Sequence, residues 1–150
     1  MSIKALYQQL SNYENVMDLE NPLNRNVLER FQSVNDITFP NQLVELFSCF
    51  NGGELFVPGT LVYGIENSDP KKTIKFANRR DFRKNFRIPE SYLIFARLNY
   101  GDLICIDLNE PHRLIQWDHE MDEEYCSWSN IEEWLSETID AYNEFEDGVI

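Results

Sequence analysis

Residues 39–64 of this 150-residue sequence, FPNQLVELFSCFNGGELFVPGTLVYG, decide the fold. Pro40 suits a first helical turn, because the amide that proline lacks would have no intrahelical partner there. From Leu43 to Phe50 the apolar residues recur at helical spacing and predict a helix with one buried face. The NGG sequence at 51–53 tolerates the left-handed conformation in which many helices end. The helix is therefore expected to stop at about Phe50.

Short apolar runs after this helix predict a β-sheet. Leu55 to Val57 and Leu61 to Ile65 flank Pro58-Gly59, a pair that suits the centre of a type II turn, so a hairpin is expected. Residues 91–98, 102–108 and 113–118 are rich in branched and aromatic side chains, and short turns separate them. Such short connections allow only antiparallel pairing, which predicts a meander.

Amphipathic patterns on both sides of these runs predict helical cover. Helices are expected at residues 2–13, from Asn21-Pro22 onward, over 71–85, and after Ser129, which fits a capping box with Glu132. The predicted fold class is α+β, in a single domain over residues 1–150. Its twisted antiparallel sheet is expected to have about five or six strands, with the helices packed mainly on one face.

The cysteines and the apolar runs predict a cytoplasmic location. Cys49, Cys105 and Cys126 are an odd number without CxxC spacing, which favours buried free thiols in a reducing compartment over a zinc or redox site. The N-terminal sequence MSIKALYQQL lacks the pattern of a signal peptide. No run approaches the ~20 apolar residues that span a membrane, so no membrane association is expected.

Charge is distributed unevenly along the chain. The net charge is −13, and residues 102–150 carry 15 acidic side chains and a single basic one. Eight of the 13 Lys and Arg residues lie between positions 71 and 87, where Lys72, Lys75, Arg79 and Arg83 would share one face of a helix. That face could contact phosphate or an acidic protein, but a solvated face is the simpler interpretation. The acidic end should repel nucleic acid and attract basic proteins.

No motif indicates catalysis or cofactor binding. On a strand, His119 would point away from the face shared by Asp118 and Glu120, so these three side chains are not expected to converge on one ion. His112 follows Pro111 in a turn and is expected to be an exposed loop residue. HExxH, GxSxG, GxGxxG and GxxxxGK[ST] patterns are all missing from the sequence. We therefore expect a non-enzymatic protein with no catalytic, cofactor-binding or metal-binding residues.

Aromatic side chains among the acidic ones predict a protein contact surface. Trp134 is expected in the core and Trp117 at least partly buried, whereas Trp128 and Met121 fit either packing or contact. A surface of carboxylates around an aromatic anchor would speed encounter with a basic partner. The candidate partner-binding residues are Trp117, Asp118, Glu120, Met121, Asp122, Glu123, Glu124 and Trp128.

An ordered set of motifs carries a family resemblance. Phe39-Pro40 before a helix, NGG at 51–53 and the strand ending at Gly64 are followed by Gly101-Asp102 and by WDHE at 117–120. This order resembles the SUKH superfamily, which includes the fungal Smi/Knr cell-wall regulators and many bacterial immunity proteins, although Phe39 stands where leucine is usual.

The resemblance implies a function in protein binding. It implies an immunity protein that neutralises a cognate toxin by direct binding, and the acidic surface fits a basic, nucleic-acid-targeting toxin. A regulatory scaffold of the Smi/Knr type, binding several cellular proteins, is the alternative. Smi/Knr proteins carry long disordered extensions that this sequence does not show, which favours the immunity interpretation.

Overall fold

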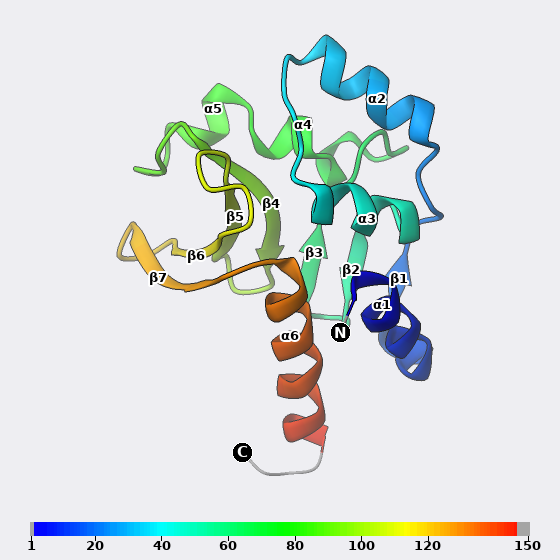
Figure 1. The fold of residues 1–150 in the computed structure, drawn as a ribbon. Coiled ribbons are helices and arrows are strands. Elements are labelled where there is room, and N and C mark those ends of the chain that lie inside the picture. The colour runs from blue at the N-terminus through cyan, green and yellow to red at the C-terminus, as the bar shows by residue number, and fades with distance from the viewer. Residues whose placement is uncertain (1, 147–150) are drawn as a thin grey trace.

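The computed structural model describes residues 2–146 and shows an α+β fold built on one antiparallel sheet (Figure 1). The strands of this part of the chain are β1 (Asp18–Leu19), β2 (Gly53–Leu55), β3 (Thr60–Val62), β4 (Tyr92–Leu98), β5 (Leu103–Asp107), β6 (Leu114–Asp118) and β7 (Glu123–Trp128). Each strand pairs antiparallel with its sequence neighbour, so the sheet order is β1-β2-β3-β4-β5-β6-β7. The predicted meander is confirmed.

Two edge strands account for the difference between seven strands and the expected five or six. β1 has two residues and pairs with β2 through Asp18 opposite Glu54. β7, with the sequence EEYCSW, is largely exposed and lacks the apolar alternation of a half-buried strand. Neither strand therefore leaves a recognisable signal in the sequence.

The helices of residues 2–146 are α1 (Ile3–Leu10), α2 (Arg25–Val34), α3 (Asn41–Cys49), α4 (Ile74–Ala77), α5 (Arg80–Arg83) and α6 (Ile131–Glu146), with 3₁₀ turns at Ser11–Val16 and Pro70–Lys72. α3 ends where expected, and α6 has 16 residues. Asn24 rather than Asn21 caps α2, because its side chain accepts from the Asn26 amide at 2.8 Å. Within these residues no helix is both long enough and apolar enough to cross a membrane.

The expected start of α6 and the expected hairpin turn are each wrong in detail. Asn130, not Ser129, caps α6, because its Oδ1 accepts from the Glu133 amide at 2.8 Å. The Glu133 carboxylate in turn accepts from the Ser129 amide at 2.8 Å. The capping box therefore uses Asn130 and Glu133 instead of Ser129 and Glu132. Gly59 does not have the positive φ that the third position of a type II turn requires, so the turn type expected there is wrong, and the Val57–Pro58 peptide bond is cis.

The single helix expected over residues 71–85 is also wrong. Thr73 and Arg79 have extended backbone angles, with ψ of 151° and 145°, and they interrupt the segment. Thr73 caps α4 by accepting from the Phe76 amide at 3.2 Å. Because the helix is broken, the four basic side chains expected on one face do not form a continuous stripe, and Arg83 turns inward to backbone carbonyls.

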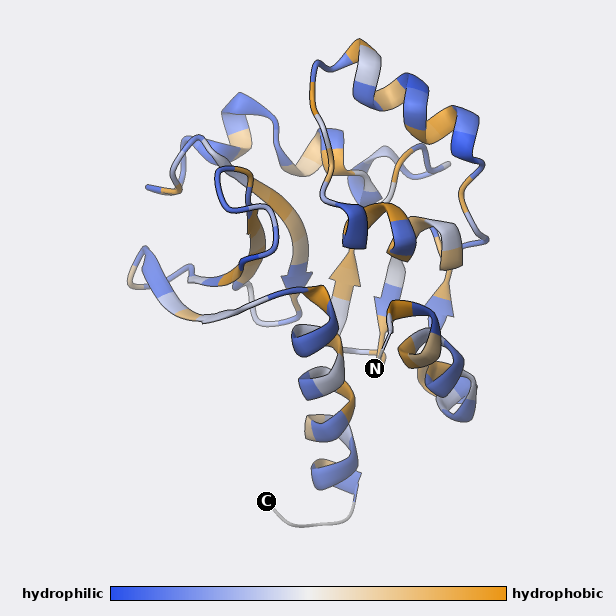
Figure 2. Ribbon diagram, in the orientation of Figure 1, coloured by the Kyte–Doolittle hydropathy of each residue, from blue (hydrophilic) through white to orange (hydrophobic). Residues whose placement is uncertain are grey.

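The core lies between the sheet and helices on both of its faces. α1, α3 and α6 contact one another and form the larger layer, in keeping with the expectation that helices pack mainly on one face. Trp134 of α6 packs edge-on against Phe95 of β4, at 5.3 Å between ring centroids. The segment around α5 covers the other face, where Arg97 lies 5.9 Å from the Phe82 ring. Figure 2 shows hydrophobic colour gathered on the central strands, and every residue of β5 is buried.

The NGG segment links the end of α3 by hydrogen bonds to the backbone that follows β3. The Asn51 side chain donates to Ile65 O at 2.5 Å and accepts from Ile65 N at 2.7 Å. Gly52 has φ +77°, and a Cβ there would lie 2.6 Å from the carbonyl oxygen of Val62. Only glycine fits both the left-handed angle and this close approach. The motif therefore serves packing of the helix on the sheet.

Candidate functional site

The β6–β7 hairpin carries most of the predicted contact residues and forms one edge of the sheet, at the opposite end from β1 (Figure 1). Its turn is closed by the Asp122 amide, which donates to Asp118 O at 2.8 Å, and Asp122 has φ +56°. The Asp118 side chain accepts from the amides of Glu120 and Met121 at 2.9 and 3.0 Å. The side chain of Asp118, the first residue of the turn, therefore fixes the turn's conformation.

Asp122 fixes the same turn to the body of the protein. Its Oδ1 accepts from the Arg87 amide at 2.8 Å and from the Trp117 indole N–H at 3.0 Å. These hydrogen bonds, the one from Arg87 first, hold the pKa of Asp122 below its usual value. Trp117 itself is only 7% exposed. Asp122 and Trp117 thus support the hairpin from within and are not free for a partner.

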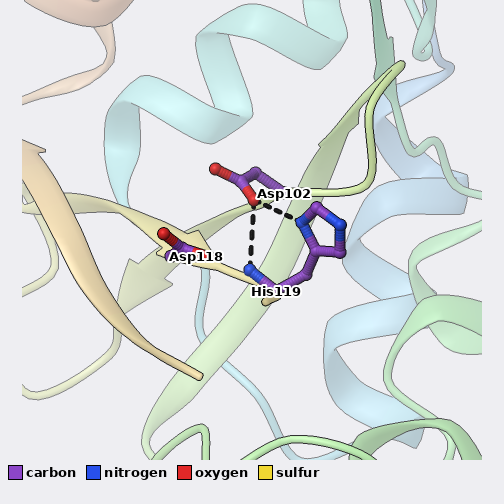
Figure 3. Close-up of side chains that lie close together, drawn as sticks. All are labelled: Asp102, Asp118 and His119. Atoms are coloured by element: carbon purple, nitrogen blue, oxygen red, sulfur yellow. Dashed lines mark hydrogen bonds and ion pairs between the residues drawn. The ribbon is translucent and has the colours of Figure 1, made fainter. Parts of the chain in front are cut away.

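Asp102 and His119 join the hairpin to the β4–β5 turn (Figure 3). Asp102 is 6% exposed. Its Oδ1 lies 2.5 Å from His119 Nδ1 and accepts from the His119 amide at 3.1 Å, while its Oδ2 accepts from Gln116 Nε2 at 2.9 Å. Burial alone would raise the pKa of Asp102, but the bonds from His119 and Gln116 outweigh it and leave this pKa lowered.

Gly101 makes room for this contact. It has φ +110°, and a Cβ at this position would lie 2.9 Å from His119 Nε2. The His119 ring therefore packs directly over the glycine. The Asp102 carboxylate can only accept a hydrogen bond, so His119 Nδ1 carries the proton that it donates. The other ring nitrogen, Nε2, lies 3.8 Å from the Glu120 carboxylate.

The expectation that strand alternation turns His119 away from Asp118 is wrong, whereas Glu120 does not join them in a cluster of the described residues. β6 ends at Asp118, so strand alternation does not extend to His119, and ligand atoms of Asp102, Asp118 and His119 lie within 4.8 Å of one another. These are residue types that bind divalent ions. Asp118 Oδ1 already accepts two hydrogen bonds in the turn, however, and the two oxygens of Asp102 accept three. Holding the hairpin in place explains all of these contacts.

The exposed part of the hairpin is smaller than the predicted set. Met121 is 68% exposed, and the Glu120 side chain is 81% exposed. Glu123 is also exposed, and within residues 2–146 its side chain forms no hydrogen bond or ion pair, although its backbone pairs with Asp118. Glu124 differs, because its carboxylate binds Arg113 at 2.5 Å.

Tyr125 belongs with these residues although the predicted set did not include it. It is the extra residue of a β-bulge, since Gln116 pairs with Cys126 and Trp117 with Glu124. A bulge turns its extra side chain away from the regular alternation, and Tyr125 is 68% exposed. We call Glu120, Met121, Glu123 and Tyr125 the hairpin surface.

Trp128 lies beside the hairpin surface at the end of β7. It is partly buried against the core and donates its indole N–H to Glu137 of α6. It also lines a pocket of about 460 Å³ together with Glu110, His112 and Glu133. Further along α6, Asp140 and Glu144 are exposed, so negative charge continues from the hairpin onto the helix.

A comparison with protein families agrees with this arrangement of motifs. The sequence profile of the SMI1/KNR4 family (SUKH-1) matches residues 22–137. The chain belongs to the SMI1/KNR4 family. The matched region contains the NGG segment, Gly101-Asp102 and the β6–β7 hairpin, so the predicted family resemblance is confirmed. No curated protein matches the chain significantly.

Proposed function

We propose that this SMI1/KNR4-family chain is an immunity protein that neutralises a basic bacterial toxin by binding it through the hairpin surface. The observation that carries the proposal is the exposure of Met121 and Tyr125 on a hairpin that also exposes Glu120 and Glu123, two carboxylates without a strong partner in residues 2–146. Apolar anchors within a charged rim are the usual composition of a binding site.

Charge favours a basic partner. The chain carries a net charge of −13, and residues 118–150 contain twelve acidic residues without Lys or Arg. A toxin that cuts nucleic acid needs a basic surface to approach phosphate groups. Opposite fields accelerate the encounter of two such proteins, and a covered basic cleft can no longer reach nucleic acid.

The rigid support of the hairpin favours binding over catalysis. Asp102, Asp118 and Asp122 hold the turn by hydrogen bonds, so little conformational entropy is lost when a partner docks there. Within residues 2–146 the one carboxylate that an ion pair places beside His119 Nε2, other than the Asp102 that holds the ring, is Glu120 at 3.8 Å. We propose a non-enzymatic mechanism in which the chain blocks its partner by covering it.

The proposed site of action is the cytoplasm, where a toxin reaches nucleic acid. The three cysteines are free, and Cys105 is fully buried, with its thiol pKa raised to about 12 by burial. Free thiols are typical of proteins in a reducing compartment.

The proposal expects the neighbouring gene to encode a secreted protein with a C-terminal toxin domain, and the experiment co-expresses that domain with the chain. The chain should restore growth, and Glu120→Lys/Glu123→Lys should abolish the rescue. Glu14→Lys/Glu45→Lys makes the same change in net charge at exposed positions away from the hairpin and should still rescue. Rescue by both double variants would reject the hairpin surface, and lack of any rescue or binding by the unaltered chain would reject the immunity function. Binding to several cellular proteins instead would support the scaffold alternative.

A further inference from the structure

Arg83 is held in one position by neutral acceptors. Its Nη1 donates to Asn78 Oδ1 at 3.0 Å and to Tyr92 O at 2.7 Å, and its Nη2 donates to Pro89 O at 2.9 Å. Asn78 is itself fixed, because its side chain bonds both backbone groups of Ile94, at 2.8 and 2.9 Å. The guanidinium therefore has a defined position and direction.

The charge of Arg83 is not neutralised within the protein. In residues 2–146 no carboxylate lies within 4.0 Å of its guanidinium. The group is partly buried, and this burial lowers the pKa of Arg83. A desolvated cation without a counter-ion is unfavourable, so an incoming anion would gain more here than at an exposed lysine.

Two further cations stand around the same pocket. The pocket has a volume of about 470 Å³ and is lined by Asn78, Arg80, Arg83, Lys84, Ile88 and Glu90. Arg80 and Lys84 are exposed and form no ion pair with the described residues, unlike Arg79 and Arg87, which pair with Asp81 and Asp122. Three cations and one carboxylate leave a net charge of about +2 on the lining.

We propose that this pocket binds the phosphate group of a small phosphate monoester. Such a group carries about −1.5 to −2 charges near neutral pH, which matches the lining. Three of the five guanidinium N–H donors of Arg83 are used by protein acceptors, so two remain for phosphate oxygens. A nucleic acid polymer fits less well, because the whole chain carries −13 and would repel its remaining phosphates. The site is separate from the hairpin surface and does not depend on the proposed toxin partner.

Calorimetric titration of the full chain at constant ionic strength tests the proposal, with inorganic phosphate, AMP and a single-stranded oligonucleotide as probes. Phosphate and AMP should bind at one saturable site and raise the unfolding temperature. Arg80→Gln/Lys84→Gln should weaken that binding about tenfold or more without changing the unfolding temperature in chloride. Arg83→Lys keeps a charge but loses the planar fork, and should also weaken binding.

Lys71→Gln/Lys72→Gln is the matched control, because it removes two exposed cations of the same basic segment outside the pocket. It should change affinity by less than about twofold. The proposal is overturned if phosphate and AMP show no saturable binding up to about 20 mM, a range that includes millimolar affinity. It is also overturned if the control weakens binding as much as the pocket variant, or if the oligonucleotide binds this pocket more tightly than AMP.

Discussion

Replacing Asp102 with alanine should destabilise the protein by about 3 kcal/mol, because one buried carboxylate serves three donors. The donors are the His119 amide at 3.1 Å, His119 Nδ1 at 2.5 Å and Gln116 Nε2 at 2.9 Å. The imidazole side chain is 28% exposed and can turn to water, and Gln116 keeps its bond to the Tyr100 hydroxyl. What remains is one unpaired amide and one lost bond to a charged group, each contributing about 1–3 kcal/mol.

Urea unfolding followed by tryptophan fluorescence near neutral pH measures this loss. Asp102→Asn should lose about half as much, since its oxygen can still accept from His119 while its amide faces the Gln116 donor. Amide exchange at His119 should accelerate in both variants, because the hairpin turn loses its link to the β4–β5 turn. Asp140→Ala, at an exposed position of α6, is the control and should change stability by less than about 0.5 kcal/mol. A loss below about 0.5 kcal/mol for Asp102→Ala would refute the reasoning.

The pH dependence of the same comparison follows from the pKa of Asp102, which folding lowers. The folded state therefore binds a proton at this carboxyl less readily than the unfolded chain does. The resulting stability is present above the unfolded pKa of about 3.9 and is lost as the pH falls through the lower folded value. The gap between the unaltered protein and Asp102→Asn should shrink as the pH falls below about 5, where the Asp102 carboxyl takes up its proton. A gap that widens below about pH 5 would contradict the assignment.

Other substitutions separate packing from binding. Asn51→Ala should cost about 2–4 kcal/mol in urea unfolding, because it leaves both backbone groups of Ile65 without the Asn51 side chain. Gly101→Ala should lower the unfolding temperature, since its Cβ would meet His119 Nε2 at 2.9 Å with φ at +110°; an unchanged temperature would show that the ring moves freely. Tyr125→Ala should leave stability within about 0.5 kcal/mol and weaken toxin binding by about 1 kcal/mol or more, whereas the reverse pattern would place Tyr125 in the fold.

The fold was largely predictable because its main elements carry strong periodic patterns. α3 and α6 have apolar stripes, and the three central strands have continuous apolar runs. β7 was missed because an exposed edge strand needs no apolar alternation. The helix expected over 71–85 was wrong because periodicity does not record that Thr73 caps a new helix, nor that Arg83 bonds the carbonyls of Pro89 and Tyr92.

The contacts of the candidate site residues could not be predicted from the sequence. Acidic and aromatic residues directed the prediction to the β6–β7 hairpin, yet composition does not show which of these residues have partners within the fold. Asp118 and Asp122 hold the turn, Glu124 binds Arg113, and Trp117 is buried. Each of these roles depends on contacts within the fold. The Asp102–His119 contact joins residues 17 apart in sequence, so no local pattern reveals it.

The most direct test of the central claim is the association rate of this chain with the toxin domain that the proposal expects its neighbouring gene to encode, measured by stopped-flow fluorescence from about 0.02 M to about 0.5 M salt. We expect the rate to fall about tenfold or more over this range, because the acidic surface steers a basic partner. Glu120→Lys/Glu123→Lys should lower the rate at low salt far more than Glu14→Lys/Glu45→Lys does. A rate that does not change with salt, or one that both double variants lower equally, would contradict binding through the hairpin surface.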